Sequence, residues 1–88
     1  MINVRLGDGF EIQLEDDVMD DYDLVMLFGQ YRKNPSMDIV VDIAIKMLGE
    51  EQHKALMDHL RDEKGKLKTS AMMAALEEIE DAIPAVKN

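Results

Sequence analysis

The feature that most constrains the fold is an alternation of apolar and polar residues on both sides of Gly7-Asp8-Gly9. The apolar members are Ile2, Val4 and Leu6 before the glycines, and Phe10, Ile12 and Leu14 after them. Period-two alternation around a glycine-rich turn predicts an antiparallel β-hairpin over residues 2–14. Because an isolated hairpin is only marginally stable in water, the rest of the chain must cover its apolar face.

The remainder of the chain has helical periodicity and predicts about four short helices. The expected ranges are about 20–33, 36–48, 50–62 and 70–83. Candidate N-caps lie at Asp16 to Asp20 and at Ser36, and Gly49 should separate the second helix from the third. The second helix is apolar over most of its surface, so we expect it to be central. We therefore expect a single domain over residues 1–88 with a mainly helical α+β fold, in which the N-terminal hairpin packs on the helices.

The charge and composition argue against several classes of protein. The net charge is −9, which disfavours binding to nucleic acid and to anionic membranes. There is no cysteine, so disulfides and cysteine–zinc sites are excluded. No apolar run approaches the roughly 20 residues needed to span a bilayer, and the N-terminus lacks the hydrophobic region of a signal peptide. We therefore expect an intracellular protein without membrane or nucleic-acid partners.

No constellation of residues predicts an enzyme, a metal site or a cofactor. His53 and His59 are six residues apart, a rotation of about 600° along a helix, so their side chains lie on different sides of it. A metal pair on a helix instead has i, i+4 spacing, which places both ligands on one face. The acids between Asp16 and Asp23 lack the glycine and glutamate of an EF-hand loop. Ser36 begins a helix like the modified serine of an acyl carrier protein, but a proline precedes it where those proteins have aspartate. We therefore interpret Ser36 as an N-cap.

Seven acidic residues and no base lie between Glu11 and Asp23. This run fits a solvated edge that also supplies helix caps. It would also suit a basic partner. The sequence leaves both interpretations open.

The chain contains eight methionines, and two of them, Met72 and Met73, are adjacent. On a helix these two side chains point about 100° apart, so one buried face does not readily hold both. Methionine fills irregular gaps in a small core, and it also lines surfaces that accept varied apolar partners. The second interpretation predicts an apolar groove for a partner helix.

Residues 48–52 (LGEEQ), residues 59–63 (HLRDE), a turn at Gly65 and a glutamate-rich amphipathic helix follow one another in the chain. This pattern resembles the small tail assembly chaperones of tailed phages and prophages of Gram-positive bacteria. The resemblance extends to Phe10-Glu11-Ile12 and to the acidic run that follows it. The chain departs from the family pattern at residues 29–33, which are more basic, and at residues 72–75, which are more apolar.

The resemblance implies a non-enzymatic chaperone in the bacterial host cytoplasm. Its partner would be the tape measure protein, the tail tube subunits or both, held until the tube polymerises, and a homo-oligomer is compatible with this role. We expect contact through the apolar stripe of the last helix, with Phe28 and Tyr31 as second choice. The stripe consists of Met72, Met73, Leu76, Ile79 and Ile83. The alternatives are a self-associating structural phage protein and an acidic DNA mimic that inhibits a nucleic-acid-binding protein.

Overall fold

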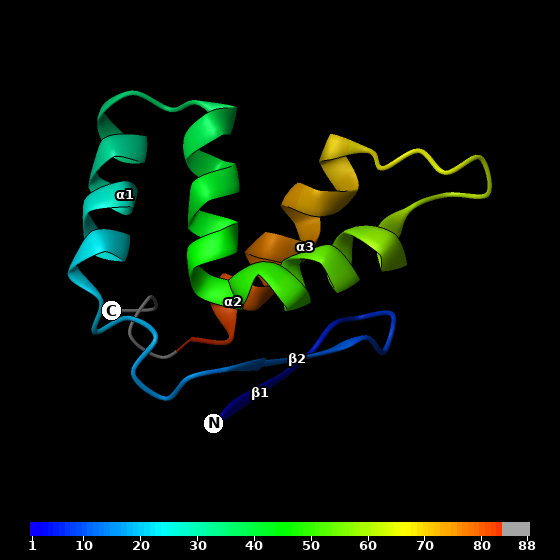
Figure 1. Ribbon diagram of the computed structural model, residues 1–88, viewed down its shortest axis with the longest axis horizontal. Coiled ribbons are helices and arrows are strands. Elements are labelled where there is room, and N and C mark those ends of the chain that lie inside the picture. Colours follow the sequence, from blue (N-terminus) through cyan, green and yellow to red (C-terminus); the bar gives the residue numbers. More distant parts are fainter. Residues whose placement is uncertain (84–88) are drawn as a thin grey trace.

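The computed structural model describes residues 1–83, which form a two-stranded antiparallel hairpin and three helices. The elements are β1 (Ile2–Arg5), β2 (Glu11–Leu14), α1 (Tyr22–Lys33), α2 (Met37–Leu60) and α3 (Thr69–Asp81). In Figure 1, α1 and the first half of α2 stand side by side, and the second half of α2 turns to run along the hairpin. α3 packs against α2. The mainly helical α+β prediction is confirmed in this coarse form.

The hairpin follows the alternation of the sequence. Val4 lies opposite Ile12 in the register, and both side chains are buried on the face that meets the helices. The turn closes where the Gly9 N–H donates to the Leu6 carbonyl oxygen at 2.8 Å. Gly9 has a φ of 94°, which a residue with a Cβ rarely adopts. The predicted hairpin is therefore confirmed.

The prediction of about four helices differs from the structure only in the count around Gly49. The expected helices over 36–48 and 50–62 fall within the single range of α2, as two helical halves that meet at a kink at this residue. Gly49 has φ 81° and ψ 160°, a conformation outside the helical region that glycine reaches without steric cost. The glycine thus redirects the helix axis within a single residue, and no connecting loop separates the two halves.

Side chains cap the first two helices. The Asp21 carboxylate accepts a hydrogen bond from the Leu24 N–H at 3.3 Å, so the cap of α1 lies one residue beyond the stretch in which we expected it. The Ser36 hydroxyl accepts from the Ile39 N–H at 3.3 Å, which confirms its predicted capping role. Both bonds satisfy N–H groups that a helix start leaves without an internal partner.

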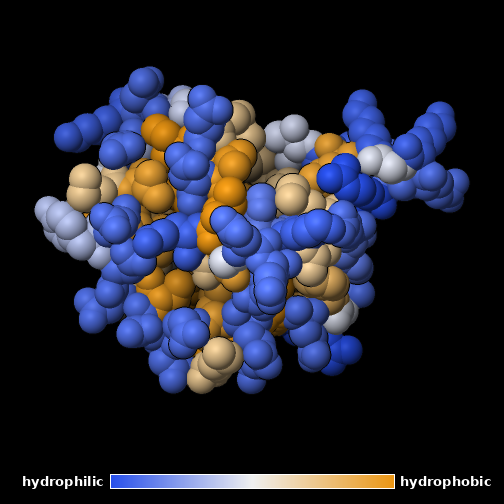
Figure 2. Space-filling view, viewed as in Figure 1, coloured by the Kyte–Doolittle hydropathy of each residue, from blue (hydrophilic) through white to orange (hydrophobic). Residues whose placement is uncertain are grey.

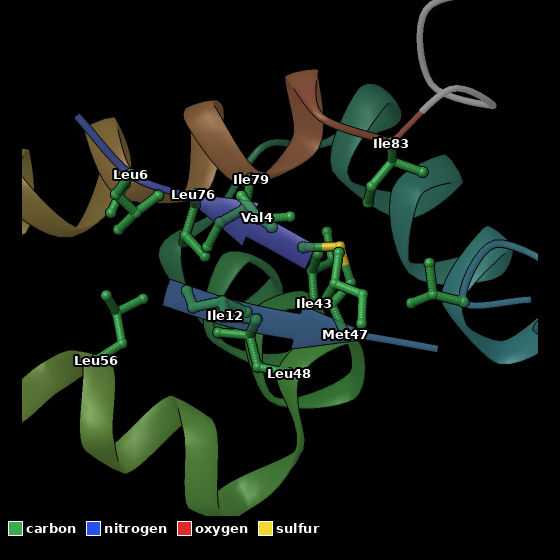
Figure 3. Close-up of a cluster of buried hydrophobic side chains, with 14 of the residues drawn as sticks. Val4, Leu6, Ile12, Ile43, Met47, Leu48, Leu56, Leu76, Ile79 and Ile83 are labelled. Carbon is green, nitrogen blue, oxygen red and sulfur yellow. The ribbon is translucent and has the colours of Figure 1, made fainter. Parts of the chain in front are cut away.

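The core lies between the inner face of the hairpin and the three helices. Its largest fully buried side chains are Ile12, Leu14, Leu24, Leu56, Ile79 and Ile83. Figure 3 shows side chains from both strands, from α2 and from α3 pointing toward one another. The bend at Gly49 lets Ile43 from the first half of α2 and Leu56 from the second half enter the same cluster.

Candidate functional site

The structure divides the predicted contact residues into a buried group and a half-buried group. Leu76, Ile79 and Ile83 are 5%, 0% and 2% exposed, and they point into the core (Figure 3). All three side chains pack into the core, and only Leu76 also contributes a small exposed part to the groove described below. The half-buried residues are Met72, Met73, Phe28 and Tyr31. The sequence prediction includes these buried residues because the stripe that marks one face of a helix does not distinguish a core face from a docking face.

Three helices enclose an open, mainly apolar groove of about 540 Å³, which we call the three-helix groove. It is lined by Phe28, Tyr31, Val40, Ile43, Ser70, Met73, Ala74, Leu76, Glu77 and Glu80. Phe28 and Tyr31 come from α1, and Met73 comes from α3. The fold thus brings the first-choice and second-choice contact residues of the sequence prediction into one site.

A second cavity, of about 200 Å³, lies on the other side of Met73, which lines both. We call it the methionine cavity because Met37, Met57, Met72 and Met73 all line it. Met37 is 49% exposed, so this cavity continues onto the surface. Figure 2 shows hydrophobic residues reaching the surface between hydrophilic ones on the face of the molecule that Figure 1 presents. Four of the eight methionines thus surround one small cavity, where their flexible side chains can adjust to one another.

One wall of the three-helix groove is acidic. Glu77 and Glu80 line it from α3. Burial raises the pKa of the Glu80 carboxyl, and the neighbouring charges of Asp81 and Glu77 raise it further. No ion pair among residues 1–83 includes Glu77 or Glu80. Two carboxylates therefore face an apolar site in which the described residues supply no countercharge.

The contact residues predicted from the sequence do not include Glu77 or Glu80. The sequence assigns them to the polar face of the last helix, opposite the apolar stripe. The available signal was the spacing of Ser70, Met73, Glu77 and Glu80, which recur every three or four residues and so share one face of α3. That face is half apolar and half acidic, and only the position of α1 and α2 shows that it borders a groove.

Part of the N-terminal acidic run has a structural role. Asp21 caps α1, and its carboxylate lies 3.5 Å from the Lys46 ammonium on α2. Asp23 lies 3.9 Å from the same ammonium. These contacts join the start of α1 to α2, which agrees with the capping interpretation. Binding of a basic partner to the remaining acids stays a prediction.

The two histidines lie in different environments. His53 is buried and lines the methionine cavity. His59 lies at the hairpin turn, where its Nε2 is 2.7 Å from a carboxylate oxygen of Asp8 and its ring stacks on Phe10 at a centroid distance of 4.3 Å. The pKa of the Asp8 carboxyl is held below its usual value. The main cause is the hydrogen bond that the carboxylate accepts from the Phe10 N–H, followed by its hydrogen bond with His59. Within residues 1–83, no three potential metal ligands of the His, Cys, Asp or Glu type lie close enough to hold an ion.

Comparisons with protein-family models, with curated proteins and with solved structures found no match. Among the helices of residues 1–83, none has the length and apolarity required to cross a bilayer. The three-helix groove and the residue pattern described above are therefore the features from which a function can be inferred.

Proposed function

We propose that this protein is a non-enzymatic phage tail assembly chaperone. It binds apolar helical segments of the tape measure protein, the tail tube subunits or both during tail assembly. The observation that carries the proposal is the three-helix groove, which presents Phe28, Tyr31 and Met73 together at the surface of a folded chain. The resemblance of the sequence to small tail assembly chaperones supplies the identity of the partner.

The physical properties of the groove suit this role. An amphipathic helix binds by laying its apolar face into a hydrophobic groove, where a few aromatic and aliphatic anchors provide most of the affinity. Met73 in the wall of the groove adapts to different apolar side chains, which helps a chaperone that meets many segments of one long chain. The net charge of −9 keeps the complex with an aggregation-prone partner in solution.

Co-expression with the tape measure protein of the same phage tests the proposal. Met73→Asp places a charge in the groove and should reduce the amount of partner recovered in a pull-down by about tenfold or more. Met26→Asp is the matched control, because Met26 is an exposed methionine on α1 that does not line the groove. Circular dichroism should show that both variants are folded. Undiminished recovery with Met73→Asp and with Phe28→Asp would exclude this groove as the binding surface.

A self-associating structural subunit is the second candidate. Tyr22, Val25 and Met26 are 79%, 46% and 47% exposed on α1, outside the groove, and such a patch could join two copies. The two candidates differ in the finished particle. A structural subunit remains in purified virions, whereas an assembly chaperone is absent from them. A neighbouring gene for a very long helical protein would also favour the chaperone.

The acidic DNA mimic remains a third proposal, with weaker support. It requires carboxylates spaced like phosphates along an elongated surface. Asp21 and Asp23 instead lie against Lys46, and Asp21 also caps a helix. Competition with duplex DNA for a basic DNA-binding protein would test this role directly.

A further inference from the structure

We infer that the segment held in the three-helix groove is an amphipathic helix that carries lysine or arginine beside its apolar residues, and that this cation pairs with Glu77 and Glu80. The inference rests on the proposed function and specifies the chemistry of the segment that the chaperone binds. It also predicts which end of the groove the cation occupies.

The wall formed by α3 has two chemically different ends. Ser70 and Met73 lie toward the start of α3, and Glu77 and Glu80 lie toward its end. From Ser70 to Glu80 the wall extends about 15 Å, because a helix rises about 1.5 Å per residue. An occupant that fits this wall needs an apolar stretch of about two helical turns and a cation at one end of it.

The electrostatics of the acidic end favour a cation from outside. Among residues 1–83, those that line the groove include two carboxylates and no base. The last turn of α3 also contains no basic residue, although the negative end of a helix dipole favours one. A lysine or arginine of the partner would supply the missing charge at the point where Glu80 is half-buried, and a partly desolvated ion pair is stronger than one in open water.

The other two walls determine the apolar part of the occupant. α1 contributes Phe28 and Tyr31, one helical turn apart, and α2 contributes Val40 and Ile43 with the same spacing. Tyr31 supplies the only titratable group that faces the groove from these two helices. Apolar side chains of the occupant therefore pack between α1 and α2 while its cation reaches α3.

A helical occupant suits this groove because no strand edge of residues 1–83 borders it. An extended peptide gains affinity by pairing with the edge of a sheet, and the strands β1 and β2 do not line this groove. A helix satisfies its own backbone hydrogen bonds and needs only side-chain contacts from the protein. Helix-in-groove binding is therefore the mode that the walls permit.

Three synthetic peptides test the inference. Each is a fluorescent amphipathic helix of about 14 residues with the same leucine and methionine stripe, and they differ only in carrying lysine, glutamine or glutamate at the position flanking that stripe. Binding to the full chain is measured by fluorescence anisotropy at low and high salt. We expect the lysine peptide to bind about fivefold more tightly than the glutamine peptide, and the glutamate peptide to bind more weakly than both.

Protein variants show whether the difference arises in the groove. The double variant Glu77→Gln with Glu80→Gln should remove the preference for lysine, whereas Glu63→Gln should retain it. Glu63 is the matched control because it is exposed in the loop between α2 and α3, outside the groove. High salt should weaken the preference in the unmodified chain, since ions screen exposed charge pairs.

Each failure points to a different conclusion. Equal affinity for all three peptides, abolished by Met73→Asp, would overturn the acidic-wall inference and leave the proposed chaperone function intact. A lysine preference without recovery of the tape measure protein in the pull-down would support the groove chemistry and count against the chaperone function. Light scattering that shows a dimer formed through the groove, which dissociates with Met73→Asp and excludes the peptides, would make a second copy the occupant and overturn the inference.

Discussion

The side-chain amide of Gln52 pairs with the backbone of Gln13 as a neighbouring strand would. Its Oε1 accepts from the Gln13 N–H at 2.8 Å, and its Nε2 donates to the Gln13 carbonyl oxygen at 2.7 Å. The same Nε2 donates to the Leu48 carbonyl oxygen at 3.0 Å, next to the bend at Gly49. One side chain thus joins the hairpin to α2 at the place where the helix changes direction.

Gln52→Ala should therefore lower the free energy of unfolding by about 1–2 kcal/mol, because it removes these three hydrogen bonds from a half-exposed site. Urea unfolding followed by circular dichroism measures the change. The matched control is Gln30→Ala on α1, an exposed position where we expect a change within about 0.5 kcal/mol. Hydrogen exchange at the Gln13 amide should also accelerate in Gln52→Ala, and unchanged exchange there would contradict the proposed link.

Gly49 and Gly29 should respond to alanine in opposite directions. Gly49→Ala should destabilise the protein by about 1–3 kcal/mol, because alanine is strained at a φ of 81° even though a Cβ would meet no atom within 4 Å. Gly29 lies inside α1, where a Cβ would approach only the end of the Arg32 side chain, at 3.9 Å. Gly29→Ala should therefore stabilise by about 0.5–1 kcal/mol. Thermal unfolding of both variants tests the pair, and equal effects would show that the bend does not depend on the glycine.

Substitution of two residues of the predicted contact stripe, Ile79 and Met73, should have different effects on stability because they differ in burial. Ile79 is fully buried, so Ile79→Ala should cost about 2–4 kcal/mol through lost packing and an internal cavity. Met73 lines two open sites and is half-buried, so Met73→Ala should cost about 1 kcal/mol or less. The loss of partner binding should follow the reverse order, with Met73→Ala weakening binding more than Ile79→Ala, since only Met73 is exposed to the partner. Chemical unfolding gives the first ranking, and peptide binding gives the second.

Some of these structural features could be predicted from the sequence alone, and others could not. The hairpin was predictable because its signal is local: a period of two on both sides of a glycine turn. The Ser36 cap was predictable for the same reason. The break at Gly49 was predictable as well, but the direction of the helix beyond it was not, because long-range contacts such as that of Gln52 with Gln13 hold it in place.

The candidate site was predictable only in part. Phe28, Tyr31 and Met73 could be selected as apolar residues on helix faces, but their meeting in one groove depends on how α1 and α3 pack against α2. Glu77 and Glu80 belonged to the polar face by pattern, and only tertiary packing turns that face toward the groove. Sequence periodicity gives the faces of each helix, and the relative placement of the helices gives the site.

Asp8 should make the hairpin turn sensitive to acid. The Phe10 N–H, and then His59, lower the pKa of its carboxyl below the ordinary 3.8 in the folded protein. The ionised carboxylate therefore contributes stability above about pH 3.8, and this contribution is lost as the pH falls through the folded pKa. Asp8→Asn should remove the dependence, and His59→Ala should remove part of it. Urea unfolding over this range would contradict the argument if the Asn variant lost stability as steeply as the unmodified chain.

Glu80 should show the opposite dependence. Burial, together with the charges of Asp81 and Glu77, raises its folded pKa above the ordinary 4.5. Between 4.5 and the raised value the unfolded chain ionises first, so the free energy of unfolding falls as the pH rises through this window. Glu80→Gln removes the charge, and it should be more stable than the unmodified chain near neutral pH and equally stable below about pH 4.

Binding of the lysine peptide should lower the raised pKa of the Glu80 carboxyl, because a cation in the groove stabilises the ionised carboxylate. Carbon-detected NMR titration of the Glu80 side chain, with and without the peptide, measures this shift directly. The side chain of Glu63, exposed and outside the groove, provides the internal reference in the same spectra. A Glu80 titration unchanged by saturating lysine peptide, under conditions where the peptide binds, would show that the cation pairs elsewhere.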